Sequence, residues 1–138
     1  MREERGMTLV ELLAALALLS IIIMLVGSVM FFGQKQYSKQ TETIAKQDEV
    51  RFVMSTITKA IRSHHADEVT VADSVLTIGT DQYKLNTSQL LKNSVVLSDQ
   101  IAVFNVIKQD EQIDITIGST SDEYNEKQTL STVIYLRE

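Results

Sequence analysis

Residues 12–32 read LLAALALLSIIIMLVGSVMFF, a run of 21 residues without a charge, and this run decides the fold. As a helix it would be about 31 Å long, which matches the hydrocarbon core of a bilayer, about 30 Å thick. A cleaved secretory signal has a shorter apolar region, of about 7–15 residues. We therefore predict one membrane-spanning helix, and only one, because the sequence contains no second run of this kind.

The remainder of the 138-residue chain has the composition of a small folded domain. Residues 34–138 hold 26 of the 31 formal charges, and hydrophobic residues make up 44% of the whole chain. This segregation argues against a soluble single-domain protein and against a protein with several membrane spans. The chain has no Cys, which excludes disulfides and metal sites built on thiolates.

Glu11 lies between Val10 and Leu12, inside an otherwise apolar stretch. A carboxylate at the centre of a membrane helix costs about 2.5–3.5 kcal/mol, and the cost is smaller near a helix end. Either the side chain reaches the membrane surface and has no further role, or it pairs with a cation from another molecule. We favour the second interpretation, because an ionisable group in a membrane helix is a functional hypothesis by default.

The short polar head of the chain ends at Gly6, and Met-Thr-Leu-Val-Glu-Leu-Leu follows. This string resembles the class III leader of the type IV pilins and pseudopilins. The family pattern is Gly, a cleavage point, a hydrophobic residue, Thr, Leu, a hydrophobic residue and Glu. Each position matches, although the first mature residue is Met7 where the family more often has Phe. A cytoplasmic N-terminus is implied by this resemblance alone, because Lys and Arg are equally frequent on the two flanks of the span.

The resemblance also implies how the chain is processed and assembled. A prepilin peptidase would cut between Gly6 and Met7 and methylate the new amino group of Met7. That amine would meet the Glu11 carboxylate of a neighbouring subunit and so supply the missing cation. Gly6 and Met7 are then the processing residues, and Thr8 and Glu11 the assembly residues. The implied domains here are a leader (residues 1–6) and a transmembrane or filament-core helix (residues 7–33).

The same resemblance names partners and a location. The implied partners are the prepilin peptidase, other pilin or pseudopilin subunits, the pilus assembly machinery and membrane lipid. The implied location is the cell membrane, crossed once, with an extracytoplasmic C-terminal head that reaches the cell surface when the chain is assembled.

Residues 34–65 contain neither Gly nor Pro, and their apolar residues recur at spacings of three and four. That period is typical of an amphipathic helix. Because only Gly33 interrupts the boundary with the apolar run, we predict one continuous helix over residues 7–65. Its apolar face is predicted to comprise Val50, Val53, Met54, Ile57, Ala60 and Ile61, with Tyr37 and Ile44 as a looser extension.

After Asp67 the hydrophobic period changes to two, which predicts β-strands. The candidate strands are residues 69–72, 75–78, 82–85, 95–97, 101–107, 113–117 and 130–136, and residues 119–128 are predicted to form a loop. Residues 101–107 are apolar on both faces, which favours a central strand. Short connections predict an antiparallel sheet that packs on the apolar helix face. The predicted fold class is α+β and pilin-like, with a long N-terminal helix packed on a small antiparallel β head, residues 66–138.

No catalytic residue, metal site or cofactor is predicted. His64 and His65 are adjacent, so on a helix their side chains would point about 100° apart and would not converge on one ion. The acidic residues within 119–126 lack the spacing and the Gly of a calcium loop. The sequence contains no nucleophile motif and no Gly-rich phosphate loop, so we predict that the protein is not an enzyme.

The leading hypothesis is a minor pilin or pseudopilin subunit of a pilus, competence or secretion filament. A weaker resemblance over residues 83–85, 90–91 and 101–104 points to the J-type or competence minor pseudopilins. One alternative is a pilus subunit that binds DNA. The net charge of +3 over residues 34–65 favours it, but the net charge of −7 over residues 66–138 disfavours it. The other alternative is a membrane-anchored extracytoplasmic domain that never polymerises.

Overall fold

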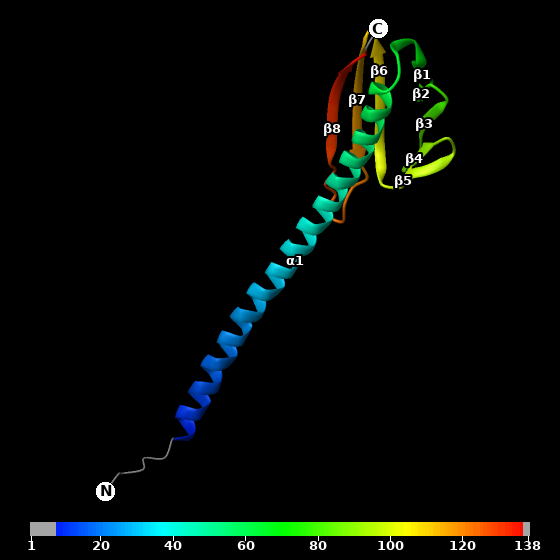
Figure 1. The fold of residues 1–138 in the computed structure, drawn as a ribbon. Helices are drawn as coiled ribbons and strands as arrows, with labels where there is room; N and C mark the ends of the chain where they lie inside the picture. The colour runs from blue at the N-terminus through cyan, green and yellow to red at the C-terminus, as the bar shows by residue number, and fades with distance from the viewer. Residues whose placement is uncertain (1–7, 137–138) are drawn as a thin grey trace. The chain divides into compact units, whose positions relative to one another are not determined.

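The computed structural model describes residues 8–136. The chain divides into two compact units, Met1–Ser38 and Lys39–Glu138, which are described separately below. Helix α1 (Leu9–Arg62) contributes to both of them (Figure 1). The prediction of one continuous helix is thereby confirmed over the described residues, and the helix ends three residues earlier than expected.

In the first unit, the apolar side chains of α1 are exposed over the whole described length. Leu9 and Phe31 are 75% and 71% exposed, and a Cβ added at Gly27 or Gly33 would meet no atom within 4 Å outside the adjoining backbone of its own helix. Within residues 8–136, α1 is the one helix long and apolar enough to cross a membrane. Such a surface is stable only against lipid or other apolar helices, so this unit fits a single-pass membrane anchor.

In the second unit, the later turns of α1 bury the predicted apolar face. Five of its six members are buried, and Ala60 is half-buried; the buried ones are Val50, Val53, Met54, Ile57 and Ile61. The looser extension does not share this burial, because Ile44 is 56% exposed. The helix ends at Arg62, and the side chain of His64 turns back over its last turn, where Nδ1 lies 2.8 Å from the carbonyl oxygen of Ala60.

Eight strands follow a short 3₁₀ helix, η1 (Ala66–Glu68). They are β1 (Val69–Ala72), β2 (Val75–Ile78), β3 (Asp81–Asn86), β4 (Gln89–Lys92), β5 (Val95–Ser98), β6 (Ile101–Gln109), β7 (Gln112–Ser119) and β8 (Thr129–Tyr135). All pairings are antiparallel, and they form a five-stranded sheet in the order β1-β2-β3-β4-β5 and a three-stranded sheet in the order β6-β7-β8. The α+β, pilin-like fold class is confirmed, with two small sheets in place of one.

Strand β4 was not predicted, and tight turns explain why the sequence pattern did not reveal it. Gln89–Lys92 has only two apolar residues, and two-residue turns join it to its neighbours. The turn between β4 and β5 is formed by Asn93 and Ser94, with φ angles of 51° and 69°. Positive φ at both positions is the geometry of a type I′ hairpin, here without the Gly that usually signals it.

The prediction that residues 101–107 form a central strand is wrong for the hydrogen-bonded sheet. β6 lies at an edge of the three-stranded sheet and β7 lies in the middle. One face of β6 contacts β1, β3 and β4 of the other sheet, while Val103 and Ile107 on its other face are exposed, at 38% and 45%. Its Lys108 reinforces that junction, since Nζ donates hydrogen bonds to the carbonyl oxygens of Ala66 (2.8 Å) and Val69 (2.7 Å). Apolar residues on both faces of β6 therefore do not indicate a central strand: one face packs between the two sheets and the other is exposed.

Gly79, in the turn between β2 and β3, has a backbone that a side chain would strain. Its φ is +57°, and an added Cβ would lie 2.9 Å from Nε2 of His64. We expect Gly79→Ala to lower the free energy of unfolding by about 1–3 kcal/mol. Urea denaturation of the full chain in detergent micelles measures this, with Gly33→Ala as the control because a Cβ added at Gly33 would contact nothing outside the adjoining backbone of its own helix. Equal stability of the two variants would contradict the expectation.

Candidate functional site

The first turn of α1 is closed by a reciprocal hydrogen-bonded pair, Thr8 and Glu11. The backbone N–H and the hydroxyl of Thr8 donate to Oε2 of Glu11, at 2.8 and 3.0 Å. The N–H of Glu11 donates in return to Oγ1 of Thr8, at 3.3 Å. The first helical bond runs from the N–H of Leu12 to the carbonyl of Thr8, at 3.1 Å. Thr8 is therefore the N-cap residue, and the pair forms a capping box.

The capping box gives Glu11 a role that the sequence reasoning missed. A carboxylate in the first turn satisfies backbone N–H groups that have no helical partner, and it interacts favourably with the helix dipole. The signal was present as Thr8 followed three residues later by Glu11, directly before an apolar run. From the sequence, Glu11 was considered only as a carboxylate that reaches the membrane surface or that pairs with a cation from another molecule.

All the hydrogen bonds of this carboxylate to described residues involve one oxygen. Oε2 accepts both bonds from Thr8, and Oε1 accepts none from residues 8–136. The neighbouring side chains Leu9 and Val10 are exposed, at 75% and 72%. The second carboxylate oxygen is thus open to a group from outside this helix, beside apolar side chains.

The processing residues Gly6 and Met7 lie outside the described residues. The proposed ion pair between the amine of Met7 and Glu11 of a neighbouring subunit therefore stays a prediction.

Two hydroxyls farther along the span form their hydrogen bonds within the helix itself. Ser20 and Ser28 donate to the carbonyls three residues earlier, Ala17 (2.7 Å) and Leu25 (2.8 Å). This part of α1 thereby offers lipid or other helices no unpaired hydroxyl donor.

The loop between β7 and β8 contains the acidic residues that were considered for calcium. Oδ1 of Asp122 accepts the N–H groups of Tyr124 and Glu126, at 2.9 and 2.6 Å. Glu126 pairs with Lys39 at 2.7 Å, and the hydrogen bond and charge of Glu126 raise the pKa of Lys39. The Asp122 carboxylate therefore stabilises the loop internally, and the Glu126 carboxylate holds it to Lys39 of α1. Among residues 8–136, no three His, Cys, Asp or Glu residues are grouped as metal ligands.

Comparison with known protein families identifies a motif in the N-terminal segment. Residues 1–27 match the prokaryotic N-terminal methylation motif. The chain carries a class III prepilin leader. This leader supports the type IV pilin and pseudopilin family, whose members are in general structural proteins and not enzymes. It implies processing by a prepilin peptidase and assembly with other pilin subunits. No curated protein and no solved structure matches the chain.

Proposed function

We propose that this chain is a minor pilin or pseudopilin, stored in the membrane and drawn into a short filament after its leader is removed. The filament would serve DNA uptake, protein secretion or surface attachment. The observation that carries the proposal is the leader motif of residues 1–27, followed at once by a helix whose apolar side chains are exposed. Such a helix can serve first as a membrane anchor and then as the core of a filament.

The capping box supports a specific assembly step. Thr8 holds one oxygen of Glu11 and so orients the carboxylate, while Oε1 remains open among the described contacts. Cleavage before Met7 would create an amine at the same depth in the membrane. The amine of one subunit would then bind Oε1 of the next, so that each charge is neutralised without leaving the apolar surroundings. In this proposal Glu11 sets the axial register between subunits, and Thr8 positions it.

The processing step has a direct test in cells that express a prepilin peptidase. We expect the mature chain to begin at N-methylated Met7, as read by mass spectrometry of its N-terminal peptide. Gly6→Val should abolish the mature product, because a side chain at this position blocks close approach of the peptidase to the backbone. Arg5→Ala is the control and should be cut as the unmodified chain is. Recovery of the uncut chain, which still begins at Met1, from peptidase-positive cells would overturn the proposal.

A further inference from the structure

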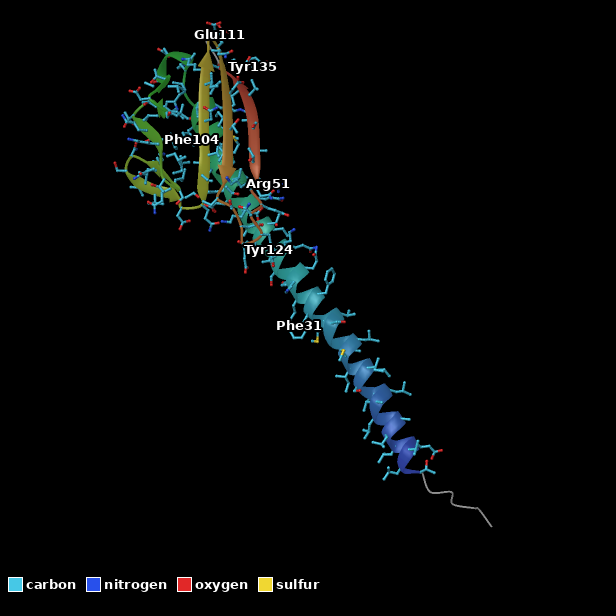
Figure 2. All side chains as sticks on the ribbon, turned by 180° about the vertical axis from the view of Figure 1, so that it is seen from behind. Phe31, Arg51, Phe104, Glu111, Tyr124 and Tyr135 are labelled. Atoms are coloured by element: carbon cyan, nitrogen blue, oxygen red, sulfur yellow. The ribbon has the colours of Figure 1, made fainter. Side chains whose placement is uncertain are left out.

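β8 is an edge strand without charge. It pairs with β7 on one side only and lies at the outer margin of the three-stranded sheet in Figures 1 and 2. Its sequence, Thr-Leu-Ser-Thr-Val-Ile-Tyr, has no charged residue, Gly or Pro. Exposed edge strands are usually protected by such residues, because unpaired backbone groups attract further strands. An unprotected edge of seven residues therefore indicates a site for strand addition.

The backbone groups at this edge can be assigned. The N–H of Leu136 donates to the carbonyl of Glu111 at 2.7 Å, so the even-numbered residues direct their backbone groups toward β7. The odd-numbered residues then direct theirs to the free edge, because successive residues alternate in direction. These are Thr129, Ser131, Val133 and Tyr135. Their backbone groups make no hydrogen bond to another of the described residues at that edge.

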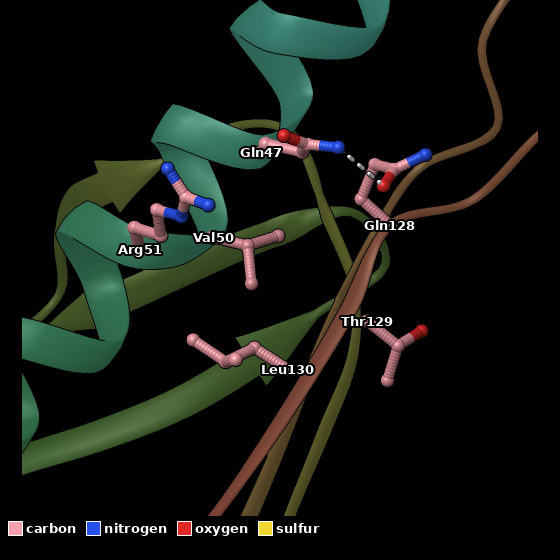
Figure 3. Close-up of a pocket in the computed structure, with 6 residues that line it drawn as sticks. All are labelled: Gln47, Val50, Arg51, Gln128, Thr129 and Leu130. Atoms are coloured by element: carbon pink, nitrogen blue, oxygen red, sulfur yellow. Dashed lines mark hydrogen bonds between the residues drawn. The ribbon is translucent and has the colours of Figure 1, made fainter.

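Two grooves flank the inner face of β8, one near each end, where it meets α1. The first has a volume of about 190 Å³, and its lining includes buried Val50, together with Arg51 and Leu130 (Figure 3). The second has a volume of about 310 Å³ and is lined by buried Ile61, by Arg62 and by residues 133–136. A strand added at the edge would direct alternate side chains toward these grooves.

Each groove carries an arginine that has no acidic partner among residues 8–136. Arg51 and Arg62 are exposed, and neither forms an ion pair within that range. They lie eleven residues apart on one side of α1, which is about 16 Å along the helix. Side chains at positions i and i+4 of an extended strand are about 14 Å apart. The spacing of the two cations thus fits one strand with two acidic side chains.

We propose that β8 binds, in antiparallel pairing, an extended segment of another polypeptide with acidic side chains at positions i and i+4. The residue between them, at i+2, would lie opposite Thr132 on the inner face. A second copy of β8 is a poorer occupant, because it has no acidic residue and would leave both arginines unpaired. The proposal concerns only the unit Lys39–Glu138 and is independent of leader processing and of Glu11.

The probe is a labelled peptide, acetyl-TETVTET-amide, titrated against the full chain in detergent micelles. Fluorescence polarisation should show saturable binding that weakens at high salt. N-methylation of the third and fifth residues should abolish binding, because their N–H groups would face β8. N-methylation of the central Val should be tolerated, because its N–H would point away. The analogue TKTVTKT should bind at least about fivefold more weakly.

Variants of the chain test the same surface from the other side. Arg51→Glu and Arg62→Glu should each weaken binding at least about fivefold, and Lys84→Glu, an exposed residue of β3, should not. Val133→Pro removes a donor at the free edge and should abolish binding; near-UV circular dichroism checks that it folds. If N-methylation or reversal of the arginines leaves affinity unchanged, or if chains cross-link through β8 without peptide, the proposal is wrong.

Discussion

Glu11→Gln is expected to reduce incorporation of the processed chain into filaments at least about a hundredfold, with membrane insertion and leader cleavage unchanged. Gln at this position preserves the capping box, because its side-chain oxygen can still accept from Thr8. It lacks the charge that would neutralise the amine of Met7 on a neighbouring subunit. Removal of one partner from a buried ion pair costs about 3–5 kcal/mol, and each 1.4 kcal/mol is about tenfold.

The measurement is the ratio of the chain in sheared filaments to the chain in membranes, by quantitative immunoblot in cells with the other subunits present. Thr8→Ala is the matched variant, since it removes the cap and leaves the charge. Loss of an N-cap costs about 1 kcal/mol, so incorporation should fall only about fivefold. Normal incorporation of Glu11→Gln would show that Glu11 acts only as a helix cap, and the assembly mechanism would then be wrong.

Ile57→Ala is expected to lower the free energy of unfolding of the Lys39–Glu138 unit by about 2–5 kcal/mol. Ile57 lies on α1 in the middle of the buried face and is 0% exposed. Truncation to Ala removes three methyl or methylene groups and leaves a cavity that the surrounding strands fill only in part. For a domain of this size such a loss is a large fraction of the total stability.

Urea unfolding of the full chain in detergent, followed by near-UV circular dichroism of its tyrosines, measures this loss. Ile44→Ala on the same helix is the control. Ile44 is 56% exposed, so the same truncation should change stability by no more than about 0.5 kcal/mol. Similar values for both variants would mean that α1 does not pack on the sheets through this face.

Periodicity revealed those elements whose burial repeats regularly along the chain. Over residues 50–61 the apolar residues of α1 recur at spacings of three and four, and Ile113, Ile115 and Ile117 of β7 alternate with half-buried polar residues. Both elements were therefore predicted correctly. β4 was missed because its hairpin turns use Thr, Asn and Ser in place of Gly. The capping box was missed because the role of Glu11 was inferred from the apolar residues around it and not from its position three residues after Thr8.

The sequence by itself determined that this chain has one apolar helix, a leader before it and a small antiparallel head. These features depend on local order along the chain, which composition and spacing record directly. Only the tertiary structure decided that β6 is an edge strand, that β8 is left open beside two grooves, and that two arginines without acidic partners lie next to it. Such features depend on which distant segments meet, and hydrophobicity reports that a side chain is buried without reporting what covers it.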